Sequence, residues 1–316
     1  MPSAFESSAF ERAKLYSNQK LDALRSTAGA LLPLDAIGIT VGSYARREAS
    51  RQSDLDYFVV TTAKPLDTTL AEAFRKAVRS EVEKPAAPGG PFDEIVADTS
   101  LLNDIGGDVD SNQTITRRML FLLEGEWLSN EAGFRSLRRE MRGRYVQDSL
   151  SDHKIALFLL NDIIRYWRTI TVDYEHKTMV GDKPKPWAIR KLKLTFSRKL
   201  LYAGGLFSVG RTADLTPARK IDELDGLLAQ PALERVEHIC GAVLSGPIRD
   251  NYERFLDRME DDGVRRALDA LPRNDADEDE TFRDLNNESH RYTRALLTAF
   301  ETTFHSTHPI RRAVIF

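Results

Sequence analysis

Two neighbouring segments decide the fold: GITVGSYARR at residues 38–47 and SDLDYFVV at residues 53–60. The first is an apolar run with β-branched residues that ends at Gly42-Ser43. The second opens with two acids one residue apart, Asp54 and Asp56, and continues as an apolar run that favours a strand. Because side chains alternate along a strand, both acids are expected on one face. The pattern predicts a strand, a turn and a second strand.

These residue types suit a metal and a phosphate. Two carboxylates held close together repel each other unless a cation neutralises them, and their hard oxygen atoms suit Mg²⁺ or Mn²⁺. A glycine turn lets another group approach the backbone closely, and Ser43 adds a hydroxyl to the exposed amides. We therefore predict that the segment holds a metal-bound nucleotide.

The combination of Gly42-Ser43, Arg46 and an Asp-x-Asp pair that begins twelve residues after Gly42 resembles the signature of the DNA polymerase β-like nucleotidyltransferase superfamily. The resemblance implies an enzyme that transfers an NMP from an NTP to a hydroxyl acceptor and releases pyrophosphate. It implies that Gly42 and Ser43 hold the triphosphate and that Asp54 and Asp56 carry two metal ions. Arg46 is expected to add positive charge beside the phosphates.

The superfamily usually places a third carboxylate on an adjacent strand, where it ligates a metal and accepts the proton of the attacking hydroxyl. The resemblance covers roughly residues 35–100, and a strand expected at 92–97 offers three acids. Glu94, which leads into two apolar residues, is the first choice for a catalytic metal ligand. Asp98 comes second because it suits a helix N-cap, and Asp93 comes third because it would lie on the opposite face.

Composition favours a globular protein with two domains. The chain has 316 residues, of which 41% are hydrophobic and 29% charged, so it can bury a sizeable core. Its net charge of −3 argues against a generally basic nucleic-acid binder. The single cysteine, Cys240, excludes an internal disulfide framework. Since the chain lacks a leader pattern and an apolar run of about 18 residues, we expect a cytoplasmic protein without a membrane partner.

The expected fold class is α+β, with a small nucleotidyltransferase α/β domain at residues 1–110 and an all-α domain at 111–316. The turn-rich sequence GGDVDSN at 106–112 sets the boundary, beyond which no strand is expected. Helical spacing predicts helices in the first domain at 7–31, 42–47 and 67–83, and in the second at 113–127, 130–145, 152–176, 186–208, 217–229, 231–245, 248–271 and 280–305.

The most basic stretch is residues 183–199, with seven Lys or Arg residues and no acid. Pro186 fits the start of a helix that would bring Arg190, Lys193 and Ser197 near one face. We expect Arg190 and Lys193 to contact the nucleotide; the alternative is a solvated face with extended lysines.

Polar residues also interrupt the apolar helix expected at 152–176. Asn161, Asp162, Arg165 and Arg168 stand at helical-neighbour spacing, so an internal pairing network is expected, with an inward-facing nucleotide contact as the alternative.

Two other functions stay open. One is a regulatory module that binds NTP without turnover. The other rests on Arg283 and His290, which resemble the Arg-x4–6-His motif of HEPN-type helical ribonucleases. For the nucleotidyltransferase the acceptor is a protein, a nucleotide or RNA, because the arrangement resembles the PII uridylyltransferase group, cyclic-nucleotide synthases of antiphage signalling and antitoxin-like AMP transferases.

Overall fold

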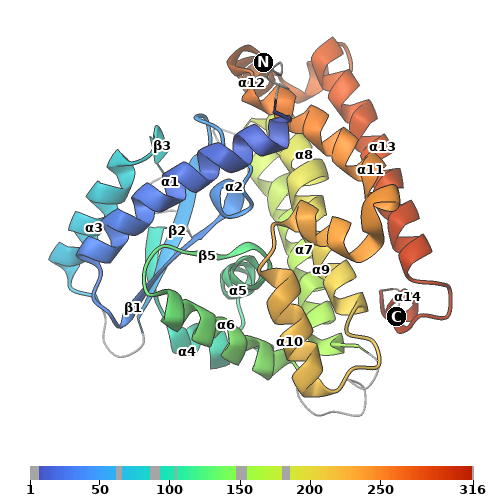
Figure 1. The fold of residues 1–316 in the computed structure, drawn as a ribbon. Helices are drawn as coiled ribbons and strands as arrows, with labels where there is room; N and C mark the ends of the chain where they lie inside the picture. Colours follow the sequence, from blue (N-terminus) through green and yellow to red (C-terminus); the bar gives the residue numbers. More distant parts are fainter. Residues whose placement is uncertain are drawn as a thin grey trace, which may run out of the picture.

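The computed structural model combines a small mixed sheet with many helices, which confirms the α+β class. In Figure 1 the sheet lies on one side of the molecule, and the helices from α7 onward form the other. The structure describes residues 7–61, 66–85, 93–103, 105–146, 155–179 and 186–314.

The sheet is built around the pair of strands predicted from the opening segment. Its strands are β1 (Ala36–Val41), β2 (Asp54–Thr61), β3 (Lys84–Pro85), β4 (Asp93–Ala97) and β5 (Glu126–Trp127). β1 and β2 are antiparallel, with Val41 opposite Asp56. β3 and β4 pair in parallel with the other edge of β2, and β5 pairs antiparallel with β1. The expectation of no strand beyond residue 110 is therefore wrong: β5 is too short to show a strand period, and only its long-range pairing creates it.

The helices follow the predicted order. They are α1 (Ala9–Leu31), α2 (Gly42–Ala45), α3 (Thr68–Ser80), α4 (Asp98–Asn103), α5 (Asn112–Glu124), α6 (Glu131–Tyr145), α7 (Leu157–Met179), α8 (Trp187–Lys193), the π-helical turn η2 (Leu194–Arg198), α9 (Lys199–Gly210), α10 (Pro217–Leu228), α11 (Ala232–Glu260), α12 (Asp262–Ala270), the 3₁₀ turn η3 (Arg273–Asp275), α13 (Glu280–Thr303) and α14 (Pro309–Ala313). In the described part of the chain, none of them has the length and apolar character needed to cross a bilayer.

Several helix boundaries differ from the prediction, and two of the differences lie in the segment 231–271. The break expected just before Pro247 lies instead at Gly241, whose φ of 79° lets the chain change direction inside α11. The second half of that helix ends at Asp261, whose carboxylate caps α12 by accepting from the amides of Gly263 and Val264.

The two faces of the sheet pack against different parts of the chain. Leu55, Tyr57 and Val59 belong to a smaller core with α1 and α3. Phe58 and Val60, on the alternate face with the two acids, belong to a larger core that continues into α5, α7 and α9. The larger core thus spans the division predicted at residue 110, and the acid pair faces the helical side.

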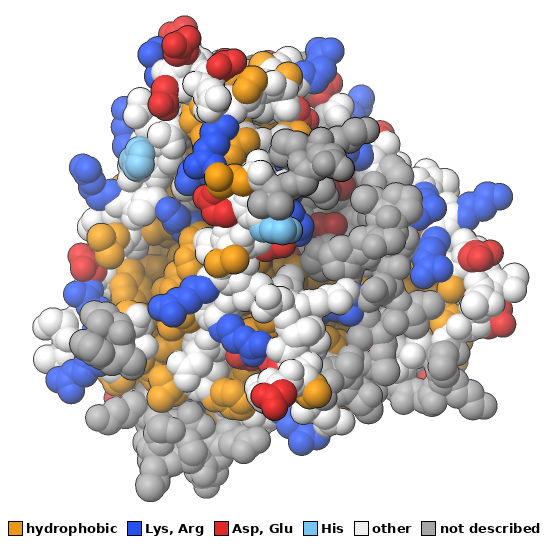
Figure 2. Space-filling model, turned by 180° about the vertical axis from the view of Figure 1, so that it is seen from behind, with side chains coloured by type: hydrophobic (Ala, Val, Ile, Leu, Met, Phe, Trp, Pro, Cys, Tyr) orange, Lys and Arg blue, Asp and Glu red, His pale blue; other side chains and the backbone are white. Residues whose placement is uncertain are grey.

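Surface charge is mixed. Figure 2 shows acidic, basic and apolar side chains interspersed over the part of the back face that is not grey.

On the sheet side, α1 is tied to α11 by Arg12, which contacts Asp257 at 2.9 Å and Glu260 at 2.8 Å. These exposed ion pairs join α1 to α11 but add little to the free energy of unfolding.

Candidate functional site

The Gly42-Ser43 turn lies in contact with the acid pair. Gly42 follows the end of β1 and has a φ of +76°, a left-handed conformation that favours glycine. A Cβ added to Gly42 would lie 3.0 Å from Asp56 Oδ2. The missing side chain is what allows the carboxylate to approach the turn. The turn and the Asp56 carboxylate therefore lie side by side.

The two carboxylates have different environments. Asp54 is exposed at the start of β2, Asp56 is partly buried, and Leu55 between them is buried on the other face, as the alternation predicts. Burial, together with the neighbouring charge of Asp54, raises the pKa of Asp56 to about 7. For Asp54, desolvation is outweighed by the combined effect of the positive charges of Lys193, Lys84 and Arg265 and a backbone hydrogen bond, which lower the pKa of its carboxyl.

Two cations from the helical side face these acids. Lys193 ends α8 and Arg198 ends the π-helical turn η2, and both act electrostatically on Asp56. In an α-helix, residues five apart point about 140° away from each other. A π-helical turn closes with i→i+5 hydrogen bonds, so residues five apart stack on one side. The turn explains how Lys193 and Arg198 face the same acids.

Of the two residues predicted to contact the nucleotide, Lys193 is the one that the structure brings to the acid pair. Burial lowers the pKa of its ammonium group to about 8, with the charge of Asp54 opposing the shift. Arg190 lies one turn earlier on α8 and is partly buried, and its contact with a nucleotide stays a prediction. Ser197, expected on the same face, accepts a hydrogen bond from Tyr252 Oη at 2.9 Å and so takes part in the helical core.

The loop before Asp54 is held by α12. Arg265, a buried residue of α12, donates from Nη2 to the carbonyl of Gln52 at 2.7 Å and from Nη1 to Ser50 Oγ at 3.3 Å. On the other side, Lys84 in β3 pairs in register with Asp54. Sequence reasoning missed Arg265 because 211 residues separate it from Asp54 and it carries no local motif.

A buried polar cluster lies directly behind the turn. Glu124 at the end of α5 accepts from the Gly42 amide at 2.7 Å through Oε1 and from Arg46 Nη1 at 2.5 Å through Oε2. Arg46 also donates from Nε to Glu48 Oε2 at 2.8 Å. The side chains of Arg46, Glu48 and Glu124 are at most 6% exposed.

Arg46 therefore does not take the role expected from sequence. Its guanidinium is buried and paired with two carboxylates, whereas a phosphate contact needs donors that are accessible from the nucleotide. The amide of Gly42 is likewise occupied by Glu124. Ser43 is partly buried in the same turn, and its carbonyl accepts from the Glu48 amide at 2.8 Å.

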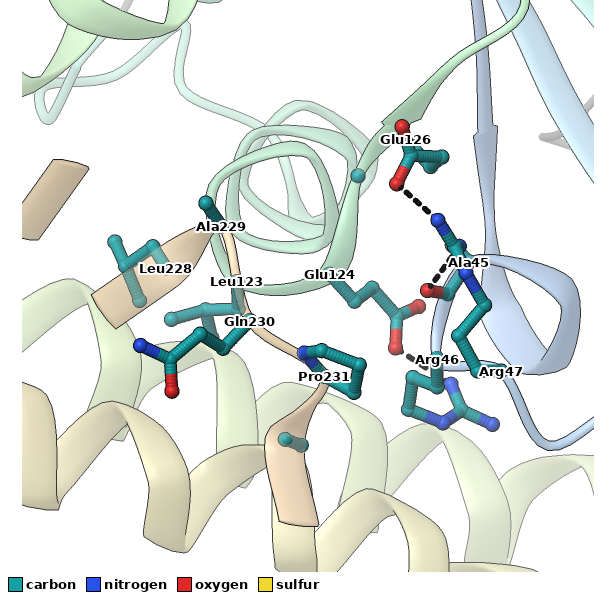
Figure 3. Close-up of a pocket in the computed structure, with 12 residues that line it drawn as sticks. Ala45, Arg46, Arg47, Leu123, Glu124, Glu126, Leu228, Ala229, Gln230 and Pro231 are labelled. Atoms are coloured by element: carbon teal, nitrogen blue, oxygen red, sulfur yellow. Dashed lines mark hydrogen bonds and ion pairs between the residues drawn. The ribbon is translucent and has the colours of Figure 1, made fainter. Parts of the chain in front are cut away.

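Figure 3 shows a small pocket beside this cluster. Its volume is about 20 Å³, enough for one water molecule. Neither Asp54 nor Asp56 lines it. The pocket is formed by residues from α2, the end of α5 and the α10–α11 connection: Ala45, Arg46, Arg47, Leu123, Glu124, Gly125, Glu126, Leu228, Ala229, Gln230, Pro231 and Ala232.

The three candidates for the third acid lie on β4 and at the start of α4, where the side chains are outside the described residues. The backbone register pairs Glu94 with Phe58 and Asp93 with Tyr57. Glu94 thus occupies a row of the same parity as Asp54 and Asp56, and Asp93 occupies the alternate row. Asp98 begins α4. Where side chains are described, no group of three or more His, Cys, Asp or Glu residues could hold a metal ion, so Glu94 as a metal ligand stays a prediction.

The internal pairing expected on α7 is confirmed for Asp162 and Arg165, which form an ion pair at 3.9 Å. Asn161 and Arg168 are exposed, and the other partners of Asp162 and Arg165 lie outside α7. Asp162 Oδ2 accepts from Arg118 Nη2 at 3.0 Å and from Tyr145 Oη at 2.5 Å. Arg165 Nη1 donates to Asp110 Oδ2 at 2.7 Å, and Arg118 Nη2 donates to the same carboxylate at 2.8 Å. Arg118, Asp110 and Asp162 are buried, and Arg165 reaches them from a half-exposed position.

The residues of the ribonuclease alternative, Arg283 and His290, are both exposed on α13.

Three residues of the site were missed from sequence: Glu124, Arg198 and Arg265. Glu124 did leave a signal, since it is an acid directly after the apolar run 119–123, where a charge needs a buried partner.

No protein-family model matches the chain, and no curated protein matches it either.

Proposed function

We propose that the protein is a metal-dependent nucleotidyltransferase of the polymerase β-like type, which transfers an NMP from an NTP to a hydroxyl acceptor and releases pyrophosphate. One observation carries the proposal: the Gly42 turn contacts the Asp56 carboxylate, at a position where Lys193 and Arg198 also act on that acid. A metal-bound NTP carries both signs of charge, and this site offers both within one small region.

The acid pair fits a divalent cation. Burial and, as the second cause, repulsion from Asp54 raise the pKa of Asp56 to about 7. Without a cation, the state in which both carboxylates are ionised is therefore disfavoured. Carboxylate oxygens are the ligands that Mg²⁺ and Mn²⁺ prefer. Asp54 and Asp56 would hold the metal, with Glu94 as the proposed third ligand. When bound, the ions would neutralise charge on the phosphates and make the acceptor hydroxyl more acidic.

Other residues would bind the triphosphate and accept the proton of the acceptor hydroxyl. The Ser43 hydroxyl and the amides that follow Gly42 would hold the β- and γ-phosphates, and Lys193 would neutralise the triphosphate from the helical side. Glu94 would accept the proton of the acceptor hydroxyl. The acceptor oxygen would form a bond to the α-phosphorus as the bond to pyrophosphate breaks. The helical part would shape the acceptor pocket for a protein, a nucleotide or RNA.

The test is an assay with each of the four labelled NTPs, Mg²⁺ or Mn²⁺, and protein, nucleotide and RNA acceptors. We expect release of pyrophosphate and a labelled product with at least one NTP. In Lys193→Met we expect the KM for that NTP to rise about tenfold or more, because a charge-assisted phosphate contact is lost.

Lys191→Met is the matched control. Lys191 lies on the same helix, but its ammonium group faces the Tyr174 ring at 6.0 Å. Its loss should leave the KM unchanged. The proposal fails if no NTP gives pyrophosphate or labelled product under any of these conditions; metal-dependent NTP binding without product would instead identify the non-catalytic binding module.

A further inference from the structure

The Gly-Ser turn is held from behind by a single carboxylate. Glu124 Oε1 accepts the Gly42 amide at 2.7 Å, although 82 residues separate the two in the chain. The Glu124 side chain is 1% exposed. A buried carboxylate in this position is neither a solvated surface charge nor a group that could reach substrate.

This contact controls a distance that matters for the proposed chemistry. A Cβ at Gly42 would lie 3.0 Å from Asp56 Oδ2, so only a glycine leaves the carboxylate room beside the turn. Glu124 fixes the opposite side by orienting the Gly42 amide. The two contacts together set the separation between the phosphate-binding turn and the carboxylates.

Glu124 is itself held by two arginines of different origin. Arg46 from α2 pairs with Oε2 at 2.5 Å, and Arg198 from η2 lies 3.6 Å from Oε1. The π-helical turn that carries Arg198 also ends α8 at Lys193, and π-helical turns occur frequently at functional sites. The helical part of the chain therefore reaches the turn through Arg198 and Glu124, and the acids through Lys193.

We propose that Glu124 is a positioning residue of the nucleotide site, which holds Gly42 and thereby sets the spacing between the Gly-Ser turn and Asp56. The inference rests on the proposed nucleotidyl transfer. Glu124 touches neither the nucleotide nor the metal, and its effect on turnover passes through the backbone of the turn. Its removal should impair transfer by more than its effect on folding stability explains.

The experiment compares Glu124→Ala and Glu124→Gln with Asp162→Ala and Asp162→Asn. Asp162 is the matched control because its side chain is only 8% exposed and accepts from Arg118 and Tyr145, away from the turn. The readouts are the Tm of each variant and its kcat and KM for the NTP. We expect Glu124→Ala to lower kcat/KM about 100-fold, since small misplacements in a site cost that much. Asp162→Ala should lower Tm comparably with kcat/KM near the wild-type value.

Glu124→Gln keeps an oxygen for the Gly42 amide but loses the charge that attracts the two arginines. The kcat/KM of Glu124→Gln should be about tenfold higher than that of Glu124→Ala. If Glu124→Ala does not fold, Glu124→Gln against Asp162→Asn decides the question, with impaired transfer expected only in the former. Equal kcat/KM in the Glu124 and Asp162 variants at equal Tm would overturn the inference. A wild-type protein inactive with every NTP would instead show that the proposed function has failed.

Discussion

Asp56→Asn should reduce nucleotidyl transfer by about a thousandfold or more and yet leave the metal-free protein at least as stable as the wild type at pH 8. Activity falls because an amide cannot replace the charged oxygen ligand that the divalent cation needs. Stability does not fall, because burial, with the adjacent charge of Asp54, raises the pKa of Asp56 to about 7. Ionised Asp56 thus opposes folding when no metal is bound.

The direction in which pH changes the stability follows from the pKa of Asp56 in the folded and unfolded states. The folded protein binds the Asp56 proton more tightly than the unfolded chain, in which the pKa has its ordinary value of 3.8. The contribution of Asp56 to the stability of the wild type should therefore fall as the pH rises from about 4 to about 7, by at most roughly 4 kcal/mol at about 1.4 kcal/mol for each pH unit. Asp56→Asn lacks this loss. The Tm of the variant minus that of the wild type should be near zero at pH 4 and positive at pH 8.

Asp108→Asn serves as the control, since Asp108 is an exposed aspartate of the loop after α4. It should change neither transfer nor the pH dependence of Tm. Transfer by Asp56→Asn within about tenfold of the wild type, or a lower Tm than the wild type at pH 8, would contradict the assignment of Asp56.

Arg118→Met is expected to destabilise the protein by about 3–5 kcal/mol, the largest effect on stability that we predict. Arg118 has no exposed side-chain surface, and its guanidinium contacts Asp110 at 2.8 Å and Asp162 at 3.0 Å. Methionine fills similar volume but leaves two buried carboxylates short of a counter-ion. In thermal unfolding this corresponds to a fall in Tm on the order of 10 °C.

Arg135→Met is the matched control. Arg135 pairs with Glu131 at 2.6 Å, but its side chain is 72% exposed. Its loss should cost less than about 1 kcal/mol. Similar Tm values for the two variants would mean that the Arg118 network contributes no more than a surface pair.

Local pattern predicts the centre of the site well. Alternation along β2 places Leu55 in the core and both acids on the other face, and a glycine at the end of β1 indicates the tight turn. These features depend on a few adjacent residues. α1 and α3 could also be predicted, because their apolar spacing extends over several turns of one continuous segment.

Features that depend on distant contacts or on an unusual helix period could not be predicted in this way. Nothing near Arg46 shows that Glu124, 78 residues later, will bury it, so a phosphate contact was the natural expectation for an arginine beside a Gly-Ser turn. Reading 186–208 as a uniform α-helix turns Arg198 away from Lys193, and only the π-helical turn aligns them.

The most direct test of the nucleotide site is a structure with Mg²⁺ and a non-hydrolysable form of the NTP that the assay selects. We expect the metal on Asp54 and Asp56, the triphosphate between the Gly42-Ser43 turn and Lys193, and Glu124 still bonded to the Gly42 amide. A nucleotide bound elsewhere, or an acid pair without metal at saturating Mg²⁺ and nucleotide, would contradict the assignment of this site.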